Sequence, residues 1–128
     1  MNDQTSYEIS QRFYFDAAHT LKRAIQNDSE AAASRRVHGH TYHAEVFLRG
    51  QPQGKSGMVM DLGFVRVEVE ALREKLDHHF LDEVAGVGIP TLENLCAYIW
   101  RELKPKLPTL CAVCVERHSI GDKCTYRP

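Results

Sequence analysis

The sequence predicts a single α+β domain in which four antiparallel strands carry two helices on one face. Segments that alternate apolar and polar residues stand toward both ends of the chain. Two segments with apolar residues spaced three and four apart lie between them. A length of 128 residues suits one hydrophobic core, so we expect one domain over residues 1–128. The predicted order is strand, strand, helix, helix, strand, strand.

The first half of the chain predicts two strands joined by a loop. Apolar and polar residues alternate over residues 7–15, and this strand ends at Asp16 and His19. Residues 21–36 are polar and rich in alanine without a clear period, which indicates a loop. Alternation returns over residues 38–49, so a second strand is expected there.

Two helices are predicted in the middle of the chain. Apolar residues recur every three or four positions over residues 62–76, directly after Asp61, a residue type that caps helix N-termini. The same period covers residues 92–103. This second helix begins after Thr91, another capping residue, and ends before Pro105, which cannot continue a helix.

The C-terminal part of the chain predicts the last two strands. Residues 110–116 have strand character, Gly121 and Asp122 indicate a turn, and a short strand follows through Tyr126. A sheet of this size keeps two open edges, and open edges favour pairing between copies of a chain. An oligomer is therefore expected.

The composition excludes several classes of function. The net charge is −1, from 16 basic and 17 acidic residues without a block of like charge, so no nucleic-acid partner is expected. No apolar run reaches the length of a membrane span, and the polar first ten residues lack the apolar region of a signal peptide. Four cysteines are too few for a disulfide scaffold. We expect a soluble, cytoplasmic protein with no membrane partner.

Three histidines form the main candidate site. His38 and His40 are two residues apart on one predicted strand, so their rings share a face. Pairing of the first two strands as a hairpin would bring His19 beside them. Three imidazoles can bind zinc and leave a fourth position open for a substrate. The same spacing also occurs in ordinary half-buried histidine pairs, so spacing alone leaves both interpretations open.

Other residues are weaker candidates. Asp77 next to His78 can orient a general base, although a helix C-terminus also favours histidine for its charge. Glu93, in the first turn of a helix, needs no functional reason. Cys111 and Cys114 are spaced like half of a zinc ribbon, but no second pair follows, so we expect them to be buried thiols.

Five blocks of sequence together resemble one family. They are FYFDAAH at 13–19, HGHTY at 38–42, GMVMD at 57–61, LDHHFL at 76–81 and PTLEN at 90–94. In this order they are similar to the 6-pyruvoyl-tetrahydropterin synthase family, including its bacterial branch, the 6-carboxy-tetrahydropterin synthases of queuosine biosynthesis. The blocks span nearly the whole chain, so the resemblance is far more specific than any one of them.

The resemblance implies the tunnelling fold, a homohexamer made of two trimers, active sites at subunit contacts and a substrate like 7,8-dihydroneopterin triphosphate. It implies that His19, His38 and His40 bind Zn²⁺, which orients the hydroxyl groups of the substrate side chain. In the family a cysteine, an aspartate and a histidine move protons, and Asp77 and His78 match the last two.

The resemblance also assigns substrate contacts and exposes two departures. Thr91 and Glu93 fall in the block that contacts the pterin. The bacterial branch has its catalytic cysteine where this chain has Ser34, whose hydroxyl is a much weaker acid than a thiol. The glutamate that anchors the pterin ring is replaced by Arg117, and Glu116 stands one position early. A shift of one residue moves a side chain to the other face of a strand unless a bulge intervenes.

Three functions are therefore considered. The first is a zinc-dependent lyase acting on a dihydropterin side chain, with His78 as base, oriented by Asp77. The second is a non-catalytic pterin or nucleotide-derivative binder that kept the metal and lost the thiol. The third is an altered enzyme in which an acidic residue of the loop, such as Glu30, replaces the cysteine.

Overall fold

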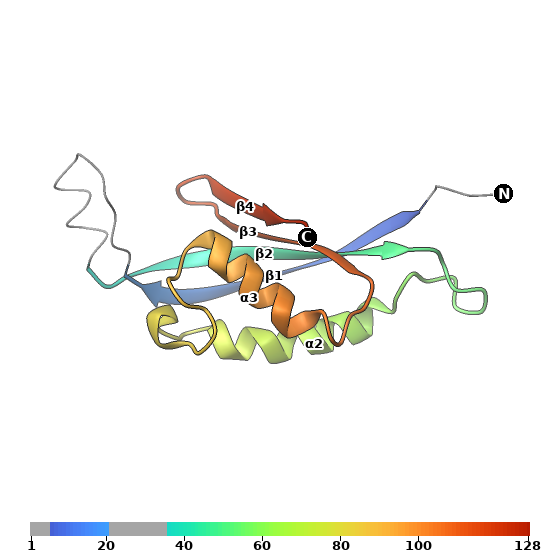
Figure 1. Ribbon diagram of the computed structural model, residues 1–128, viewed down its shortest axis with the longest axis horizontal. Helices are drawn as coiled ribbons and strands as arrows, with labels where there is room; N and C mark the ends of the chain where they lie inside the picture. The colour runs from blue at the N-terminus through green and yellow to red at the C-terminus, as the bar shows by residue number, and fades with distance from the viewer. Residues whose placement is uncertain (1–5, 21–35) are drawn as a thin grey trace.

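A computed structural model describes residues 6–20 and 36–128 of the chain (Figure 1). The described residues form an α+β layer, as the sequence predicts. Their elements, in order, are β1 (Tyr7–His19), β2 (His38–Gly50), α2 (Leu62–Leu76), the short 3₁₀ helix η1 (Leu81–Glu83), α3 (Leu92–Leu103), β3 (Leu110–Arg117) and β4 (Asp122–Tyr126).

The four strands form one antiparallel sheet in the order β1-β2-β3-β4. Both helices lie on the same side of it (Figure 1). Helix α2 packs against β1, and α3 packs against β3 and β4. The first hairpin is in register along its whole length, and this register pairs His19 with His38. The candidate metal ligands therefore lie at the end of the hairpin where β1 ends and β2 begins.

The core lies between the helices and one face of the sheet. Alternate residues of β1 and β2 are buried, and the stacked rings of Phe15 and Tyr42 lie 5.1 Å apart. Helix α2 adds a buried stripe at spacings of three and four residues, namely Val65, Val69, Leu72 and Leu76. The apolar residues at strand spacing and those at helix spacing thus pack together in one hydrophobic layer.

The capping residues set where the helices begin. The Asp61 side chain accepts a hydrogen bond from the N–H of Gly63, and the Thr91 hydroxyl accepts one from the N–H of Asn94 at 3.1 Å. Both predicted N-caps are confirmed. Helix α2 ends at Leu76, where the backbone of Asp77 becomes extended.

A sharp turn after α2 brings the chain onto the free edge of β1. His78 has φ of 58°, the left-handed region that residues other than glycine rarely adopt. Its N–H donates to the Asp16 carbonyl at 2.6 Å, and the Ala18 N–H donates to the His79 carbonyl at 3.1 Å. Phe80 then forms a parallel bridge with Ala18. Backbone pairing therefore holds the strained turn in place.

The cysteines are free thiols. Cys114 is buried, as expected, but the expectation is wrong for Cys111, which is only half-buried. The pairing of β2 with β3 shifts at this point, because Phe47 pairs with Ala112 and Leu48 pairs with Leu110. The bulge gives the core position to Leu110 and turns Cys111 away from it. Among the residues described, no helix is long and apolar enough to cross a membrane.

Candidate metal centre and neighbouring pocket

The structure brings His19, His38 and His40 together, as the predicted hairpin pairing requires. Their ring centroids are 4.5 Å (His19 to His38), 4.9 Å (His19 to His40) and 5.0 Å (His38 to His40) apart. One ring nitrogen from each lies within 4.8 Å of the other two. Such spacing allows one ion to contact all three.

Backbone carbonyls orient two of these rings. His19 Nδ1 lies 3.3 Å from the Pro90 carbonyl oxygen, and His38 Nδ1 lies 2.8 Å from that of Arg36. A carbonyl can only accept, so Nδ1 carries the proton in both rings and Nε2 keeps its lone pair. Metal-binding histidines are commonly held in this way by a partner on the other nitrogen.

Two nitrogens of this group have no protein partner. Nε2 of His19 and Nε2 of His40 are buried and make no hydrogen bond. Burial, and then the neighbouring His38, lowers the pKa of His19, while burial and then His19 lower the pKa of His40 to about 4. The His19 and His40 rings are therefore neutral at neutral pH, the form in which imidazole binds a metal. Buried polar atoms are rarely left unpaired, so this donor set fits a metal ion.

Arg117 lies on the same side of the sheet as the histidines. It is 9% exposed, its Nη2 lies 2.7 Å from Asp122 Oδ2, and its charge adds to the lowering of the pKa of His19 and His40. Arg117 Nε has no partner, and neither does the hydroxyl of the fully buried Tyr42, which burial keeps protonated by raising its pKa to about 12. Four of the five unpartnered buried side-chain atoms of the described residues thus gather around this centre.

Glu116 lies on the opposite face of β3. It pairs in register with His43 and contacts the His118 ring at 3.1 Å. The register shift between β2 and β3 is at Phe47 and Leu48, far from this point, so no bulge turns Glu116 toward the histidines. Arg117 is the residue that faces them.

Asp77 and His78 are close but not hydrogen-bonded. Asp77 Oδ2 is 3.7 Å from His78 Nδ1, whereas it is 3.3 Å from Arg73 Nη2. Asp77 Oδ1 accepts the Asp16 N–H at 2.9 Å. That hydrogen bond holds the pKa of Asp77 below its ordinary value, with smaller contributions from Arg73, His78 and His79. The carboxylate is thus ionised, but the expected bond that would fix the imidazole tautomer is absent from the structure.

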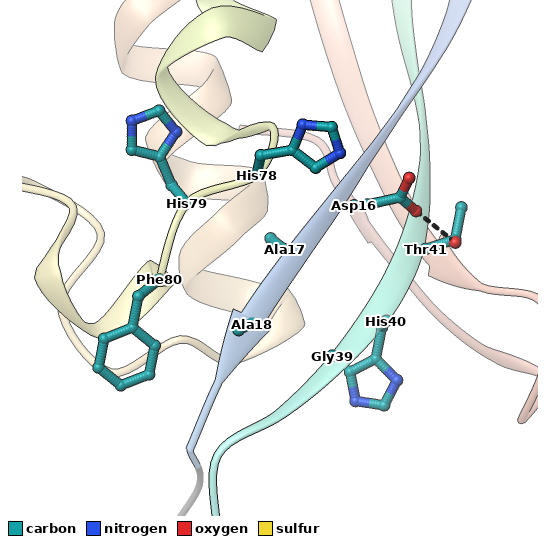
Figure 2. Close-up of a pocket in the computed structure, with 9 residues that line it drawn as sticks. All are labelled: Asp16, Ala17, Ala18, Gly39, His40, Thr41, His78, His79 and Phe80. Atoms are coloured by element: carbon teal, nitrogen blue, oxygen red, sulfur yellow. Dashed lines mark hydrogen bonds between the residues drawn. The ribbon is translucent and has the colours of Figure 1, made fainter.

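A pocket of about 660 Å³ lies over the end of the first hairpin. Figure 2 shows the residues that line it: Asp16, Ala17, Ala18, Gly39, His40, Thr41, His78, His79 and Phe80. The His78 ring is directed toward Asp16, which accepts a hydrogen bond from Thr41, and the His40 ring points away from both (Figure 2). One metal candidate and one proton-transfer candidate therefore border the same pocket.

Strand alternation separates these two candidates. Asp16 pairs with Thr41 on one face of the hairpin, and the next pair, Ala17 with His40, lies on the other face. The histidines face the core side, while the Asp77 and His78 turn meets the side of Asp16. Each group reaches the pocket from its own side of the sheet.

The remaining predicted residues lie elsewhere. The hydroxyl of Thr91 caps α3 and Glu93 is exposed in the first turn, and neither borders this pocket. They adjoin Pro90, whose carbonyl binds His19. Their role as pterin contacts stays a prediction. Ser34 and Glu30 lie outside the described residues.

Sequence reasoning missed two residues of the turn and its surroundings. Thr41 binds the Asp16 carboxylate, and Arg73 contacts Asp77. The spacing of four residues between Arg73 and Asp77, at the end of an amphipathic helix, is the signal that could have found the second contact.

The comparisons with known proteins agree on one family. The family model described as 6-pyruvoyl tetrahydropterin synthase matches residues 8–128. The 6-carboxy-5,6,7,8-tetrahydropterin synthase of Synechocystis is 30% identical over 101 residues, which covers 75% of this chain and 74% of the relative. The dihydroneopterin monophosphate aldolase of Pyrococcus furiosus is 34% identical over 100 residues, which covers 78% and 77%.

A solved structure gives the same result for the whole fold. The 6-pyruvoyl tetrahydropterin synthase of Caenorhabditis elegans superposes with a TM-score of 0.81 at 27% identity, covering 100% of this chain and 99% of that one. The tunnelling fold that the sequence predicts is thereby supported. With a match over nearly its full length, this chain belongs to the 6-pyruvoyl tetrahydropterin synthase family.

Proposed function

We propose that the protein is a zinc-dependent lyase that acts on the side chain of a dihydropterin, of the 6-carboxy- or 6-pyruvoyl-tetrahydropterin synthase type. The observation that carries the proposal is the convergence of His19, His38 and His40, in a member of this family: the Nε2 atoms of His19 and His40 are buried without a partner, and His40 lines a pocket. The 6-carboxy type belongs to queuosine biosynthesis. We also propose that this protein is located in the cytoplasm.

His19, His38 and His40 would hold the zinc ion. When bound, zinc supplies a Lewis acid that polarises an oxygen of the substrate. The carbonyls of Pro90 and Arg36 fix the orientation of the His19 and His38 rings. Each carbonyl accepts a hydrogen bond from Nδ1–H of its ring, which leaves Nε2 of that ring available to the metal.

His78 and Asp77 would move protons. The His78 side chain is 80% exposed at the pocket, so a ring nitrogen is accessible to a substrate there. The Asp77 side chain is 16% exposed, and its negative charge lies near the His78 ring. This charge favours the imidazolium that His78 forms when it takes up a proton. Two ordinary side chains thereby provide general acid and base chemistry.

The complete site would be shared between copies of the chain. The histidines and the Asp77 and His78 turn approach the pocket from different sides of the sheet, and β1 and β4 are edge strands of the described sheet. Closure of such edges between copies supports a homohexamer of two trimers, in which the turn of one subunit serves the metal of another.

Arg117, Thr91 and Glu93 are proposed to bind the substrate. Arg117 Nε and the Tyr42 hydroxyl are buried donors without partners, which suits recognition of an oxygen on the ligand. A guanidinium prefers an acceptor or anionic group, so the ring edge that it recognises differs from one that a glutamate would bind.

A second candidate is an altered or non-catalytic pterin-binding relative. Ser34 stands at the position of the catalytic cysteine, and Arg117 stands where the family has glutamate. The relative named dihydroneopterin monophosphate aldolase, 34% identical, supports altered chemistry within the same fold. In that case Glu30 is the candidate for the missing proton carrier.

The test is an anaerobic assay of the zinc-loaded protein with 7,8-dihydroneopterin triphosphate and, separately, the monophosphate. Loss of substrate absorbance with formation of a 6-substituted tetrahydropterin supports the synthase. Release of 6-hydroxymethyl-dihydropterin supports the aldolase-type reaction. Binding without turnover, even in Ser34→Cys, supports the non-catalytic candidate. No binding of either pterin contradicts both proposals.

A further inference from the structure

Contacts other than the one with Asp77 hold the Arg73 side chain in place. Its Nε donates to the Tyr14 carbonyl of β1 at 2.6 Å, and its guanidinium carbon lies 5.1 Å from the centre of the Tyr14 ring. Glu70, one turn earlier, contacts Nη1 at 3.6 Å. Only 23% of the Arg73 side chain is exposed, so this guanidinium has a defined position at the end of α2.

The Asp77 carboxylate is held at both oxygens. The Asp16 N–H binds Oδ1 at 2.9 Å, which leaves Oδ2 as the oxygen that can serve another partner. Two cationic or potentially cationic groups stand near Oδ2, with Arg73 Nη2 at 3.3 Å and His78 Nδ1 at 3.7 Å. The first distance is that of an ion pair, and the second is too long for a hydrogen bond.

The backbone of His78 cannot shift to close that gap. Its N–H donates to the Asp16 carbonyl at 2.6 Å, and its left-handed conformation is held by pairing on both sides of the turn. With this backbone fixed, the separation between imidazole and carboxylate depends on the side-chain rotations of Asp77 and His78 alone. In the structure the carboxylate leans toward Arg73.

We propose that Arg73 is a positioning residue for the Asp77 and His78 pair: its guanidinium holds Asp77 Oδ2 and keeps the His78 ring free of the carboxylate. The free ring can offer either nitrogen to a substrate at the pocket. The functional meaning of this arrangement rests on the proposed role of His78, but the arrangement itself can be tested without turnover.

A structural explanation of Arg73 makes a different prediction. A basic residue in the last turn of a helix is stabilised by the helix dipole, and lysine serves that purpose equally well. Lysine has no planar fork, so it cannot bind the Tyr14 carbonyl and Asp77 at once in the same geometry. Comparison of Arg73→Lys with Arg73→Met therefore separates the positioning role from the charge.

The experiment measures the tautomer of the neutral His78 ring by ¹⁵N–¹H spectroscopy of the full-length protein above pH 8. In Arg73→Met, Asp77 Oδ2 is released and accepts a hydrogen bond from His78 Nδ1–H, so we expect the Nδ1–H form to gain about tenfold over the Nε2–H form. Arg73→Lys should shift the ratio in the same direction. Arg66→Met, the same change on the exposed part of the same helix, should leave it unchanged.

One further variant and one fallback keep the test decisive. Adding Asp77→Asn to Arg73→Met should cancel most of the shift, because the charged acceptor is gone. If Arg73→Met does not fold, as judged by its circular dichroism, Arg73→Lys supplies the same readout. An unchanged tautomer ratio in the folded Arg73 variants overturns the proposal. Absence of pterin turnover in the wild type would count against the proposed function only, since the spectra do not depend on it.

Discussion

Two groups of side chains in the described residues each bring three possible metal-binding atoms within 4.8 Å of one another. They are the histidine group, His19, His38 and His40, and the turn group, Asp16, Asp77 and His78. In the histidine group, the Nε2 atoms of His19 and His40 are buried and have no partner. In the turn group, each aspartate already accepts a hydrogen bond, and Arg73 places a positive charge beside one of them.

The difference teaches that closeness alone does not identify a metal site. A buried lone pair without a partner is costly, and a bound cation removes that cost. A carboxylate that already accepts an N–H and contacts a guanidinium has much less to gain from a cation. These contacts support the proposal that the histidine group binds the metal and the turn group transfers protons.

The largest expected effect is on zinc content. His38→Ala or His40→Ala removes one of the three proposed ligands and should abolish stoichiometric zinc in protein purified without chelator, as measured by elemental analysis. His43→Ala, on the same strand but the opposite face, is the matched control and should retain zinc. Full zinc retention in both ligand variants would contradict the assignment.

The second effect is on catalysis by the turn group. His78→Asn should lower kcat on the pterin substrate by about 10²-fold or more, because general acid and base transfer is lost. Asparagine tolerates the left-handed backbone, so the turn should persist. His79→Asn serves as the control, and zinc content should be unaffected in both. Equal loss of kcat in the two variants would remove the special role of His78.

The third effect compares a partnered with an unpartnered hydroxyl. Thr91→Val removes the cap of α3 and should lower the free energy of unfolding by about 1 kcal/mol. Tyr42→Phe removes a buried hydroxyl that has no partner, and the metal-free protein should lose less stability than in Thr91→Val. Urea denaturation measures both. A larger loss in Tyr42→Phe would reveal a hidden partner of the hydroxyl.

The smallest effect is the pH dependence that Asp77 contributes to stability. Its pKa in the folded protein is below the ordinary value of 3.8, so the folded state favours the carboxylate. The stabilisation is fully present above that ordinary value and is lost as the pH falls through the folded pKa. The stability advantage of the wild type over Asp77→Asn should therefore shrink below about pH 4 in denaturation curves. An advantage that grows on acidification would contradict the sign.

The sequence was sufficient to predict the features that depend on the local spacing of residues in a strand or helix. Alternation in the second strand placed His38 and His40 on the face of Tyr42, and hairpin pairing of adjacent strands then brought in His19. The caps at Asp61 and Thr91 were equally readable, because each is a short-range interaction. These features need only the geometry of one strand or one helix turn.

The turn group could not be assembled in the same way. The left-handed backbone of His78 is stabilised by a hydrogen bond from its N–H to the carbonyl of Asp16, about sixty positions earlier in the chain, and no local pattern encodes that pairing. The 3.3 Å contact between Asp77 and Arg73 could not be predicted either. Arg73 and His78 both lie near Oδ2 of Asp77, and the sequence does not show which of them this oxygen contacts. Adjacency in sequence suggested a bond between Asp77 and His78 that the tertiary contacts do not make.

The most direct test of the account is the position of zinc in crystals of the zinc-loaded protein. Anomalous diffraction collected on both sides of the zinc absorption edge locates the ion without reference to activity. We expect one strong peak between the Nε2 atoms of His19, His38 and His40, and none between Asp16, Asp77 and His78. A peak in the turn group with none among the histidines would contradict the division of roles on which the proposed function depends.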